Sequence, residues 1–447
     1  MKKTMAIAVI LIISVILAAV LIAKSDFQSR ENPKAFVGVA YCGNSVAEGK
    51  QLIDKVKGYT NLLVLQSGSL QRDLKSVNEL GDYAVSAGLY FLPYFGNYIE
   101  STFSVWLESA KQRWGTHLVG VYYSDELGGK MLDDYSEFKD AATGDSITKT
   151  RYGDIVVAKS SGVVVHYELN GVINLYEPSK NSQEDVYSTF YPNGTITVKE
   201  PNSLPSSITY QQLASARPFK DINEVAERFL NRSRDDIGFL KNSTTVFSSD
   251  YALHWFDYLA GYDVMLAQVG WNISLNQQIG LCRGAATTQD KDWGVVITWK
   301  YNSPPYLDSG TEIFNQLKTS YECGAKYFVL FNYYEEGQSN PYGTLKDEHF
   351  AALESFWNNV VRNPQVAQGS VKADSVLVLP KNYGWGMRWK DDIIWGVFKA
   401  DDTTGKLWDL LQVNLKEHDL KLDIIYEDSA FTLPTQYQNI TRFKDKR

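Results

Sequence analysis

Beginning at Ala35, short runs of apolar, β-branched and aromatic residues alternate with longer amphipathic stretches. The short runs are typical of buried strands, and the longer stretches have the spacing of helices with one apolar face. Several helical stretches stop at a glycine, as at Gly58, Gly88 and Gly324, where helices commonly end. The predicted strands lie at 35–41, 61–67, 89–97, 118–126, 245–250, 263–272, 292–301 and 326–335.

Eight strand and helix units within 35–363 are the number that a (β/α)₈ barrel requires. An open, doubly wound sheet is the competing architecture for such an alternation. A nucleotide-binding domain of that kind would carry a GxGxxG turn after a strand, and this sequence contains none. We therefore predict an α/β fold built on a TIM barrel.

The segment 130–220 interrupts this pattern after the fourth predicted strand. Its short runs alternate in the manner of strands around Asn170-Gly171 and Asn193-Gly194, dipeptides that favour tight hairpin turns. These features predict a β-rich, antiparallel insertion. Because it follows the carboxyl end of a barrel strand, we expect it at the mouth of the barrel, where it could lengthen or cover a cleft.

A new pattern begins after Asn363-Pro364, with strands at 375–380 and 421–426 around a helix at 404–418. This predicts a small αβ domain at 372–447. The polar stretch that ends the chain predicts no element of its own.

The N-terminal region contains an apolar run from Met5 to Ala23 that only Ser14 interrupts. As a helix, such a run can cross the roughly 30 Å hydrocarbon core of a bilayer. A cleaved signal peptide is the alternative, although its apolar stretch usually has about 7–15 residues. We predict a transmembrane anchor at 1–24 and a polar linker at 25–34, which place the remaining chain outside the cytoplasm; cleavage would make it a secreted protein.

Composition and charge exclude several classes of function. The 447 residues contain 44 Lys and Arg against 52 Asp and Glu, a formal net charge of −8, which does not favour nucleic acid as a partner. The five histidines form no HExxH pair and the three cysteines lie far apart, so neither a metal site nor a cofactor is predicted. Aromatic residues make up 13% of the chain, more than a core alone usually requires.

Carboxylates at the carboxyl ends of barrel strands are the first candidates for catalysis, because those ends converge on one pocket. Asp125 and Glu126 end the fourth predicted strand, and strand alternation puts them on opposite sides. Glu126 shares the parity of Gly120, Tyr122 and Ser124, which suits the barrel lumen, so it is the first candidate and Asp125 the second.

Two further candidates come from other strands. Asp250 ends the fifth strand, beside the fourth, and Glu335, followed by Glu336, ends the eighth. Glycoside hydrolysis needs two carboxyl groups that flank the scissile bond, one protonated and one charged. The alternative is structural: Asp125 in a turn, Asp250 as the cap of a helix that begins at Tyr251, and the glutamates in a solvated loop.

Aromatic and amide side chains gather at the same strand ends. Sugar rings present apolar C–H faces and hydroxyl edges, which such side chains can stack on and hydrogen-bond. Alternatively, the rings fill the barrel mouth as core with their polar tips in water. The predicted substrate-binding residues are Tyr94, Asn97, Tyr122, Trp271, Asn272, Trp299 and Tyr333.

Four stretches within residues 35–362 resemble barrel-type glycoside hydrolases and uncharacterised, largely archaeal and bacterial proteins related to them. They read GVYYSDELGG (120–129), DYALHWFDYLAGYDV (250–264), KDWGVVITWKYNSPPYLDSG (291–310) and AKYFVLFNYYE (325–335). The C-terminal αβ segment resembles flavodoxin-like or amidotransferase-like modules. The resemblance implies a hydrolase that cleaves glycosidic bonds.

One position departs from that resemblance. The large hydrolase clan with a Glu at the end of strand four usually has its nucleophilic Glu at the end of strand seven, where this chain reads Thr298-Trp299-Lys300-Tyr301. Two hypotheses follow. The first is a membrane-tethered, extracytoplasmic glycosidase that acts on a polysaccharide or glycan with two of the candidate carboxylates. The second is a carbohydrate-binding or cell-envelope protein on a barrel scaffold without catalytic activity.

Overall fold

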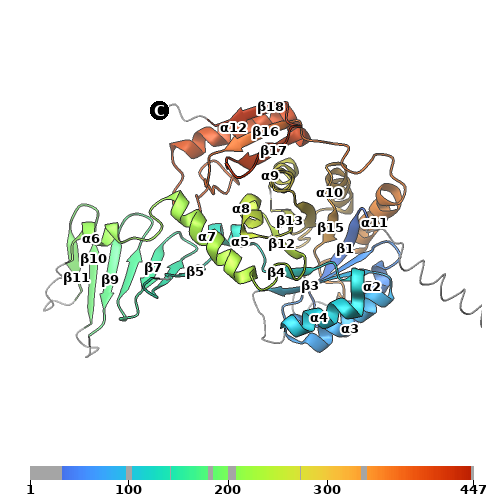
Figure 1. Cartoon of the computed structure of the whole chain (residues 1–447), viewed down its shortest axis with the longest axis horizontal. Coiled ribbons are helices and arrows are strands. Elements are labelled where there is room, and N and C mark those ends of the chain that lie inside the picture. Colours follow the sequence, from blue (N-terminus) through green and yellow to red (C-terminus); the bar gives the residue numbers. More distant parts are fainter. Residues whose placement is uncertain are drawn as a thin grey trace, which may run out of the picture.

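The structure is a computed structural model that describes residues 33–96, 103–140, 142–179, 185–199, 208–271, 273–333 and 340–443. Its centre is a closed parallel barrel with the strand order β1-β15-β14-β13-β12-β4-β3-β2 (Figure 1). All eight strands fall within the predicted ranges, so the predicted barrel is confirmed. They are β1 (Phe36–Tyr41), β2 (Leu62–Leu65), β3 (Tyr90–Gly96), β4 (Val121–Tyr123), β12 (Val246–Asp250), β13 (Val264–Val269), β14 (Asp292–Ile297) and β15 (Tyr327–Leu330).

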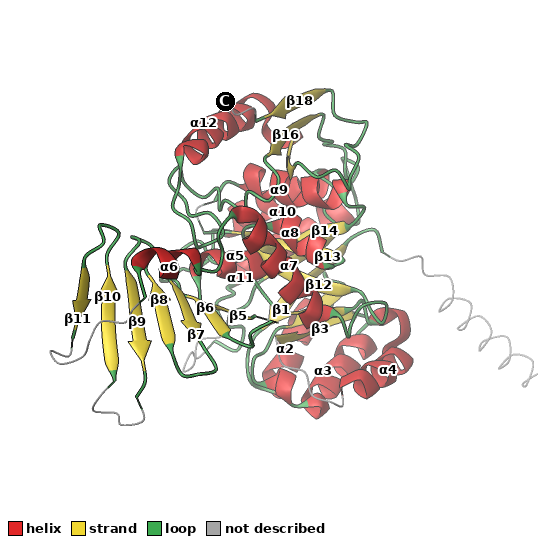
Figure 2. Ribbon diagram, turned by 60° about the vertical axis from the view of Figure 1, so that its left-hand side comes forward, coloured by secondary structure: helices red, strands yellow, loops and turns green. Residues whose placement is uncertain are grey.

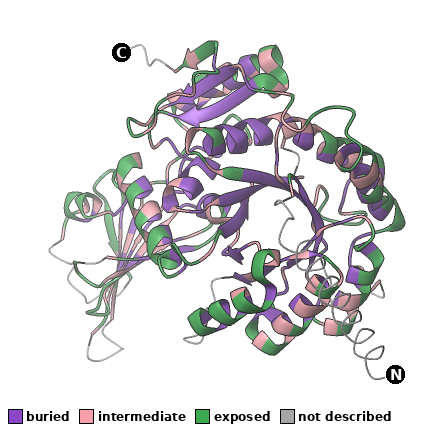
Figure 3. Ribbon diagram, turned by 45° about the vertical axis from the view of Figure 1, so that its right-hand side comes forward, coloured by how far each residue is buried: buried purple, intermediate pink, exposed green. Residues whose placement is uncertain are grey.

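Helices cover the outside of the barrel, and Figure 3 shows their buried faces turned toward the strands. Several begin after a Ser or Asp whose side chain accepts a hydrogen bond from a backbone N–H of the first turn, namely Ser45, Asp73, Asp221 and Ser309. The helices are α2 (Val46–Val56), α3 (Leu74–Ser86), α4 (Phe103–Trp114), α7 (Ile222–Ile237), α8 (His254–Ala260), α9 (Leu275–Thr288), α10 (Gly310–Glu322) and α11 (Asp347–Phe356).

Two groups of buried side chains separate the interior of the barrel from the layer between strands and helices. Tyr122 belongs to the interior group together with Phe247 and Tyr327. Its neighbours Val121 and Tyr123 belong to the outer layer. The predicted lumen parity of Tyr122 is therefore confirmed.

The insertion is a seven-stranded antiparallel sheet in the order β11-β10-β9-β8-β7-β6-β5, and it extends to one side of the barrel (Figures 1 and 2). A short helix, α5 (Leu127–Asp133), precedes it, and α6 (Tyr210–Ser215) follows. Asn170-Gly171 and Asn193-Gly194 form hairpin turns, with φ of 94° at Gly171 and 85° at Gly194. The strands are β5 (Ser136–Lys139), β6 (Ser146–Lys149), β7 (Ile155–Ala158), β8 (Val164–Tyr167), β9 (Ile173–Glu177), β10 (Val186–Phe190) and β11 (Ile196–Val198).

The C-terminal segment forms a three-stranded parallel sheet in the order β17-β16-β18. The third strand, β18, lies in the polar stretch for which no element was predicted. The sheet packs on the barrel through α9, where a Cβ at Gly280 would come within 2.9 Å of the Leu422 carbonyl oxygen. Its elements are β16 (Ser375–Leu379), α12 (Asp402–His418), β17 (Leu422–Tyr426) and β18 (Asn439–Arg442).

A buried ion pair reinforces this contact. Arg283 Nε of α9 donates to Asp423 Oδ1 of β17 at 2.8 Å, and their side chains are 6% and 0% exposed. The predicted transmembrane segment 1–24 lies outside the described residues. Among the helices that are described, none is both long and apolar enough to cross a bilayer.

Candidate active site

A pocket of about 260 Å³ lies at the carboxyl end of the barrel strands. It contains both Asp125 and Glu126. No residue that the structure describes in the inserted sheet lines it, so the predicted extension of the cleft by the insertion stays a prediction. The complete lining is Gln66, Asp125, Glu126, Ser249, Gln268, Trp271, Val296, Thr298, Trp299, Phe331 and Tyr333.

Asp125 is held by three hydrogen-bond donors from the barrel interior. Its Oδ1 accepts from the Tyr122 hydroxyl at 2.6 Å and from the Ser249 hydroxyl at 2.7 Å, and its Oδ2 accepts from Gln66 Nε2 at 3.4 Å. Burial raises the pKa of Asp125 above its usual range, and Lys130 and these hydrogen bonds offset only part of that rise. The donors fix the orientation of the carboxylate and favour its charged form.

Glu126 has a different environment from its neighbour. Its Oε1 accepts from Gln268 Nε2 at 2.8 Å, and its Oε2 lies 3.8 Å from Lys130 Nζ. Gln268 is itself oriented by Trp271 Nε1, which donates to the amide oxygen at 3.2 Å. Burial raises the pKa of Glu126 and the charge of Asp125 raises it further, whereas Gln268 and Lys130 lower it. Glu126 therefore retains a proton more readily than a solvated glutamate does.

The backbone explains how two consecutive carboxylates reach one pocket. The strand β4 ends at Tyr123, and the chain then adopts positive φ at Ser124 (60°) and Glu126 (57°). These left-handed residues end the alternation of sides, so the predicted opposite orientation of Asp125 and Glu126 is wrong. Two backbone hydrogen bonds hold the turn, Ser124 N to Gly96 O at 2.9 Å and Glu126 N to Ser249 O at 2.8 Å.

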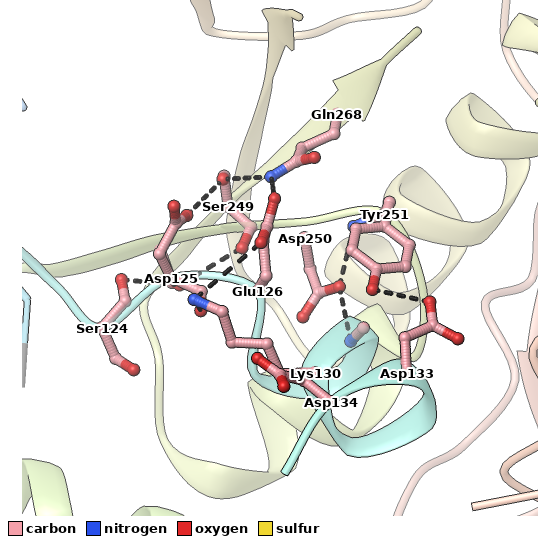
Figure 4. A network of polar contacts seen from close by, with 12 residues as sticks. Ser124, Asp125, Glu126, Lys130, Asp133, Asp134, Ser249, Asp250, Tyr251 and Gln268 are labelled. Atoms are coloured by element: carbon pink, nitrogen blue, oxygen red, sulfur yellow. Dashed lines mark hydrogen bonds and ion pairs between the residues drawn. The ribbon is translucent and has the colours of Figure 1, made fainter. Parts of the chain in front are cut away.

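The structure corrects the prediction for Asp250, which does not line the pocket. Its side chain is buried and accepts hydrogen bonds from the backbone N–H groups of Gly128, Gly129, Tyr251 and Ala252, at 2.6 to 3.0 Å. Figure 4 shows bonds of this set between the Asp250 carboxylate and the start of α5 and Tyr251. Burial raises the pKa of Asp250 to about 7, and the N–H donors act against this shift. Asp250 is thus a structural carboxylate. The predicted alternative is a cap for a helix that begins at Tyr251, whereas the helix that Asp250 caps is α5.

Aromatic residues form one wall of the pocket, and Trp271, Trp299 and Tyr333, three of the predicted substrate-binding residues, are among them. The rings of Trp299 and Tyr333 meet edge to face with centroids 4.4 Å apart, and Trp271 lies 6.3 Å from Trp299. Trp271 and Tyr333 are each 38% exposed, so part of their surface is open to a ligand. Tyr94 does not line the pocket but packs edge to face on Tyr122 below the carboxylates, with centroids 5.1 Å apart. Three predicted residues, Asn97, Asn272 and Glu335, lie outside the described residues.

Several residues of the site were not predicted as functional. Ser249 connects the two carboxylates, because it donates to Asp125 and accepts from Gln268 Nε2 at 3.0 Å (Figure 4). Gln66 and Gln268 are polar residues within otherwise apolar strands. This pattern indicates a polar barrel lumen, but it does not indicate which side chains the two amides contact. The sequence signal for Ser249 is its position near the end of β12, directly before Asp250. Within the described ranges, no group of His, Cys, Asp and Glu side chains could hold a metal ion.

Comparisons with known proteins give similarity in structure alone. No family model and no curated protein matches the chain. Among solved structures, the chain is similar to GH5_18 from Streptomyces cattleya in complex with GlcNAc, with 8% identity and a TM-score of 0.47 over 92% of this chain and 99% of that one. It is also similar to a mutant of the Thermobaculum terrenum O-GlcNAc hydrolase, with 8% identity and a TM-score of 0.31 over 73% of this chain and 59% of that one. The function of this chain therefore has to be inferred from its own pocket.

Proposed function

We propose that the protein is a glycoside hydrolase in which Glu126 is the general acid and Asp125 the charged partner. The observation that supports this most directly is that both carboxylates line one aromatic-walled pocket yet have different environments. Glycosidases need one carboxyl group that carries a proton and one that is charged. The proposed reaction class follows from that asymmetry.

The two roles are assigned from the hydrogen bonds. Asp125 accepts from three donors, an arrangement that stabilises negative charge. Glu126 accepts from one amide and stands beside that charge, so it is the group that keeps a proton for the leaving-group oxygen. Asp125 can then stabilise the positive charge that develops on the anomeric carbon as its bond to the leaving-group oxygen breaks. A water molecule completes hydrolysis by bonding to that carbon and returning a proton to Glu126.

The aromatic wall supplies the matching surface for the substrate. The partly exposed rings of Trp271 and Tyr333 can contact the apolar C–H face of a sugar, while Gln66 and Thr298 offer polar atoms to its hydroxyls. A pocket of about 260 Å³ has room for about one sugar ring. The proposed substrate is therefore a polysaccharide or glycan of which one residue enters the pocket.

The test is turnover of a glycan panel by the full chain, with reducing ends as the readout. Glu126→Gln and Asp125→Asn should each lower kcat by about 10²-fold or more, because general acid–base groups contribute about 10²- to 10⁴-fold. Glu137→Gln, at an exposed glutamate of the inserted sheet, is the matched control. Turnover that is unaffected by both pocket substitutions would reject the assignment.

A non-catalytic carbohydrate-binding protein is the second candidate. It is favoured by the residues after β14, where Thr298 and Trp299 line the pocket and no carboxylate stands, although the hydrolase clan that the sequence resembles would have a glutamate at that strand end. In that case the chain would bind glycans saturably and release no reducing ends. Glu126→Gln would then leave glycan affinity nearly unchanged, whereas removal of Trp271 would weaken it.

We also propose that the protein is tethered to a membrane by residues 1–24 and acts outside the cytoplasm. The support is the apolar run from Met5 to Ala23. Membrane fractionation of the full chain and of a chain that begins at residue 25 tests this proposal. The full chain should sediment with membranes and be digested by external protease in intact cells. Recovery of both chains in the same soluble fraction would contradict it.

A further inference from the structure

A second cavity, of about 320 Å³, lies where the inserted sheet meets the C-terminal part of the chain. Its walls come from β8 and β9, from α6, which lies beside the sheet in Figure 2, and from the loop that leads to α12. Tyr167, Leu169 and Phe398 provide much of its apolar surface. It shares no lining residue with the barrel pocket.

Arg217 brings a positive charge to this cavity. Its guanidinium makes one long hydrogen bond, from Nη2 to the Val397 carbonyl oxygen at 3.4 Å. Its Nε is buried and has no hydrogen-bond partner, and no carboxylate of the described residues forms an ion pair with it. Because a buried donor without a partner is unfavourable, the unpaired Nε of this half-buried guanidinium is suited to an anionic ligand.

Two carboxylates of this region, Asp154, which interacts electrostatically with Arg217, and Glu168, which lines the cavity, have other hydrogen-bond partners. Asp154 accepts from the Leu169 backbone N–H at 2.8 Å and contacts His166 Nε2 at 3.1 Å. Glu168 accepts from the amides of Asn170 and Asn174, at 2.9 and 2.8 Å. Neither neutralises the guanidinium by direct contact, so its hydrogen-bonding capacity remains available in the cavity.

We propose that this cavity binds a small organic carboxylate, whose charged group pairs with Arg217 while its apolar body packs on Tyr167 and Phe398. A guanidinium presents parallel N–H donors that match the two oxygens of a carboxylate. The lining contains one other cation, the exposed Lys399, and one anion, Glu168, whose two oxygens already accept from Asn170 and Asn174. This modest positive charge together with apolar walls favours a monoanion with a hydrophobic face over a phosphate group.

Such a carboxylate can come from a free organic acid or from an acidic sugar residue of a glycan. Isothermal titration of the full chain in detergent distinguishes the two sources with benzoate and glucuronate as probes, and with benzyl alcohol and glucose as their uncharged analogues. At least one acid should bind at least about tenfold more tightly than its analogue, a difference of about 1.4 kcal/mol. Binding of benzoate alone points to a free acid, and binding of glucuronate points to an acidic sugar.

Arg217→Gln should weaken binding of the acid by about tenfold or more, and Arg217→Lys by less, because a lysine keeps the charge but loses the paired donors. Arg362→Gln, at an exposed arginine outside the cavity, is the matched control. Circular dichroism verifies that each variant is folded.

The proposal is overturned if neither acid binds more tightly than its neutral analogue, or if Arg217→Gln binds the acid as the unsubstituted chain does. The first comparison needs no variant, so it decides even if Arg217→Gln does not fold. Glu126→Gln should leave this binding unchanged, which separates the cavity from the proposed glycosidase activity.

Discussion

Gln268 Nε2 donates a hydrogen bond to Glu126 Oε1 at 2.8 Å, and the same nitrogen lies 3.0 Å from Ser249 Oγ. Ser249 in turn donates to Asp125 Oδ1 at 2.7 Å. One amide and one hydroxyl thus link the two carboxylates of the pocket. Substitution of Gln268 or of Asp125 should therefore alter the pKa of Glu126. The proposed acid role of Glu126 can then be tested by the pH dependence of turnover.

Gln268→Leu removes a donor that stabilises the charged form of Glu126. The pKa of Glu126 should rise, and because the acid acts in its protonated form, the alkaline limb of the kcat profile should move to higher pH. A hydrogen bond to a charged group is worth about 1.5–3 kcal/mol, so kcat should also fall by about tenfold or more. An unchanged pH profile with reduced kcat would indicate that Gln268 has a packing role only.

Asp125→Asn should shift the alkaline limb of the kcat profile to lower pH. Burial raises the pKa of Glu126 and the charge of Asp125 adds to this, so removal of that charge lowers the pKa. Glu126 then loses its proton at lower pH, and the alkaline limb moves down while the maximal kcat falls by about 10²-fold. The measurement is the pH dependence of turnover, and a shift to higher pH would contradict the assigned roles.

Trp271→Ala should weaken substrate binding and, because Trp271 Nε1 orients Gln268, should also lower kcat, though by less than Gln268→Leu does. The side chain is 38% exposed at the pocket, so its removal leaves the core intact. Loss of an aromatic contact of about 0.5–1.5 kcal/mol predicts a KM about three- to tenfold higher. Trp389→Ala, at an aromatic residue 52% exposed outside the pocket, serves as the control and should leave KM unchanged.

Asp250→Ala should reduce stability and affect activity through the position of α5. The substitution leaves the N–H groups of Gly128 and Gly129 without their acceptor in a buried site. The free energy of unfolding should fall by about 3 kcal/mol, since each buried donor without a partner costs about 1–3 kcal/mol. Denaturant unfolding measures this change, and a loss of turnover with no loss of stability would restore Asp250 as a catalytic candidate.

Arg283 and Asp423 attach the C-terminal sheet to the barrel through a buried ion pair. Arg283→Ala or Asp423→Ala should each destabilise the protein by about 3–5 kcal/mol, because the remaining charge is buried without its partner. The double substitution Arg283→Ala with Asp423→Ala should cost less than the sum of the two single changes. Additive effects in thermal unfolding would contradict a direct coupling of the two side chains.

The barrel could be predicted from the sequence because its elements are encoded locally. Each strand is a short apolar run and each helix is an amphipathic run. The elements can therefore be counted from the hydrophobic pattern along the chain. The strand β18 could not be predicted in this way, because Asn439–Arg442 is polar, mostly exposed and held by pairing with β16. Its structure depends on a partner about sixty residues earlier in the chain.

The sequence by itself determined the barrel, the antiparallel insertion and the presence of acids and aromatic rings at the strand ends, because hydrophobic periodicity and strand order are properties of the chain. The tertiary structure decided which acids share a pocket. Positive φ at Ser124 and Glu126 brought Asp125 and Glu126 together, while the backbone N–H groups of α5 bound Asp250 elsewhere. The direction of a side chain at a strand end depends on the turn and on its hydrogen-bond partners, and local periodicity carries no information about either.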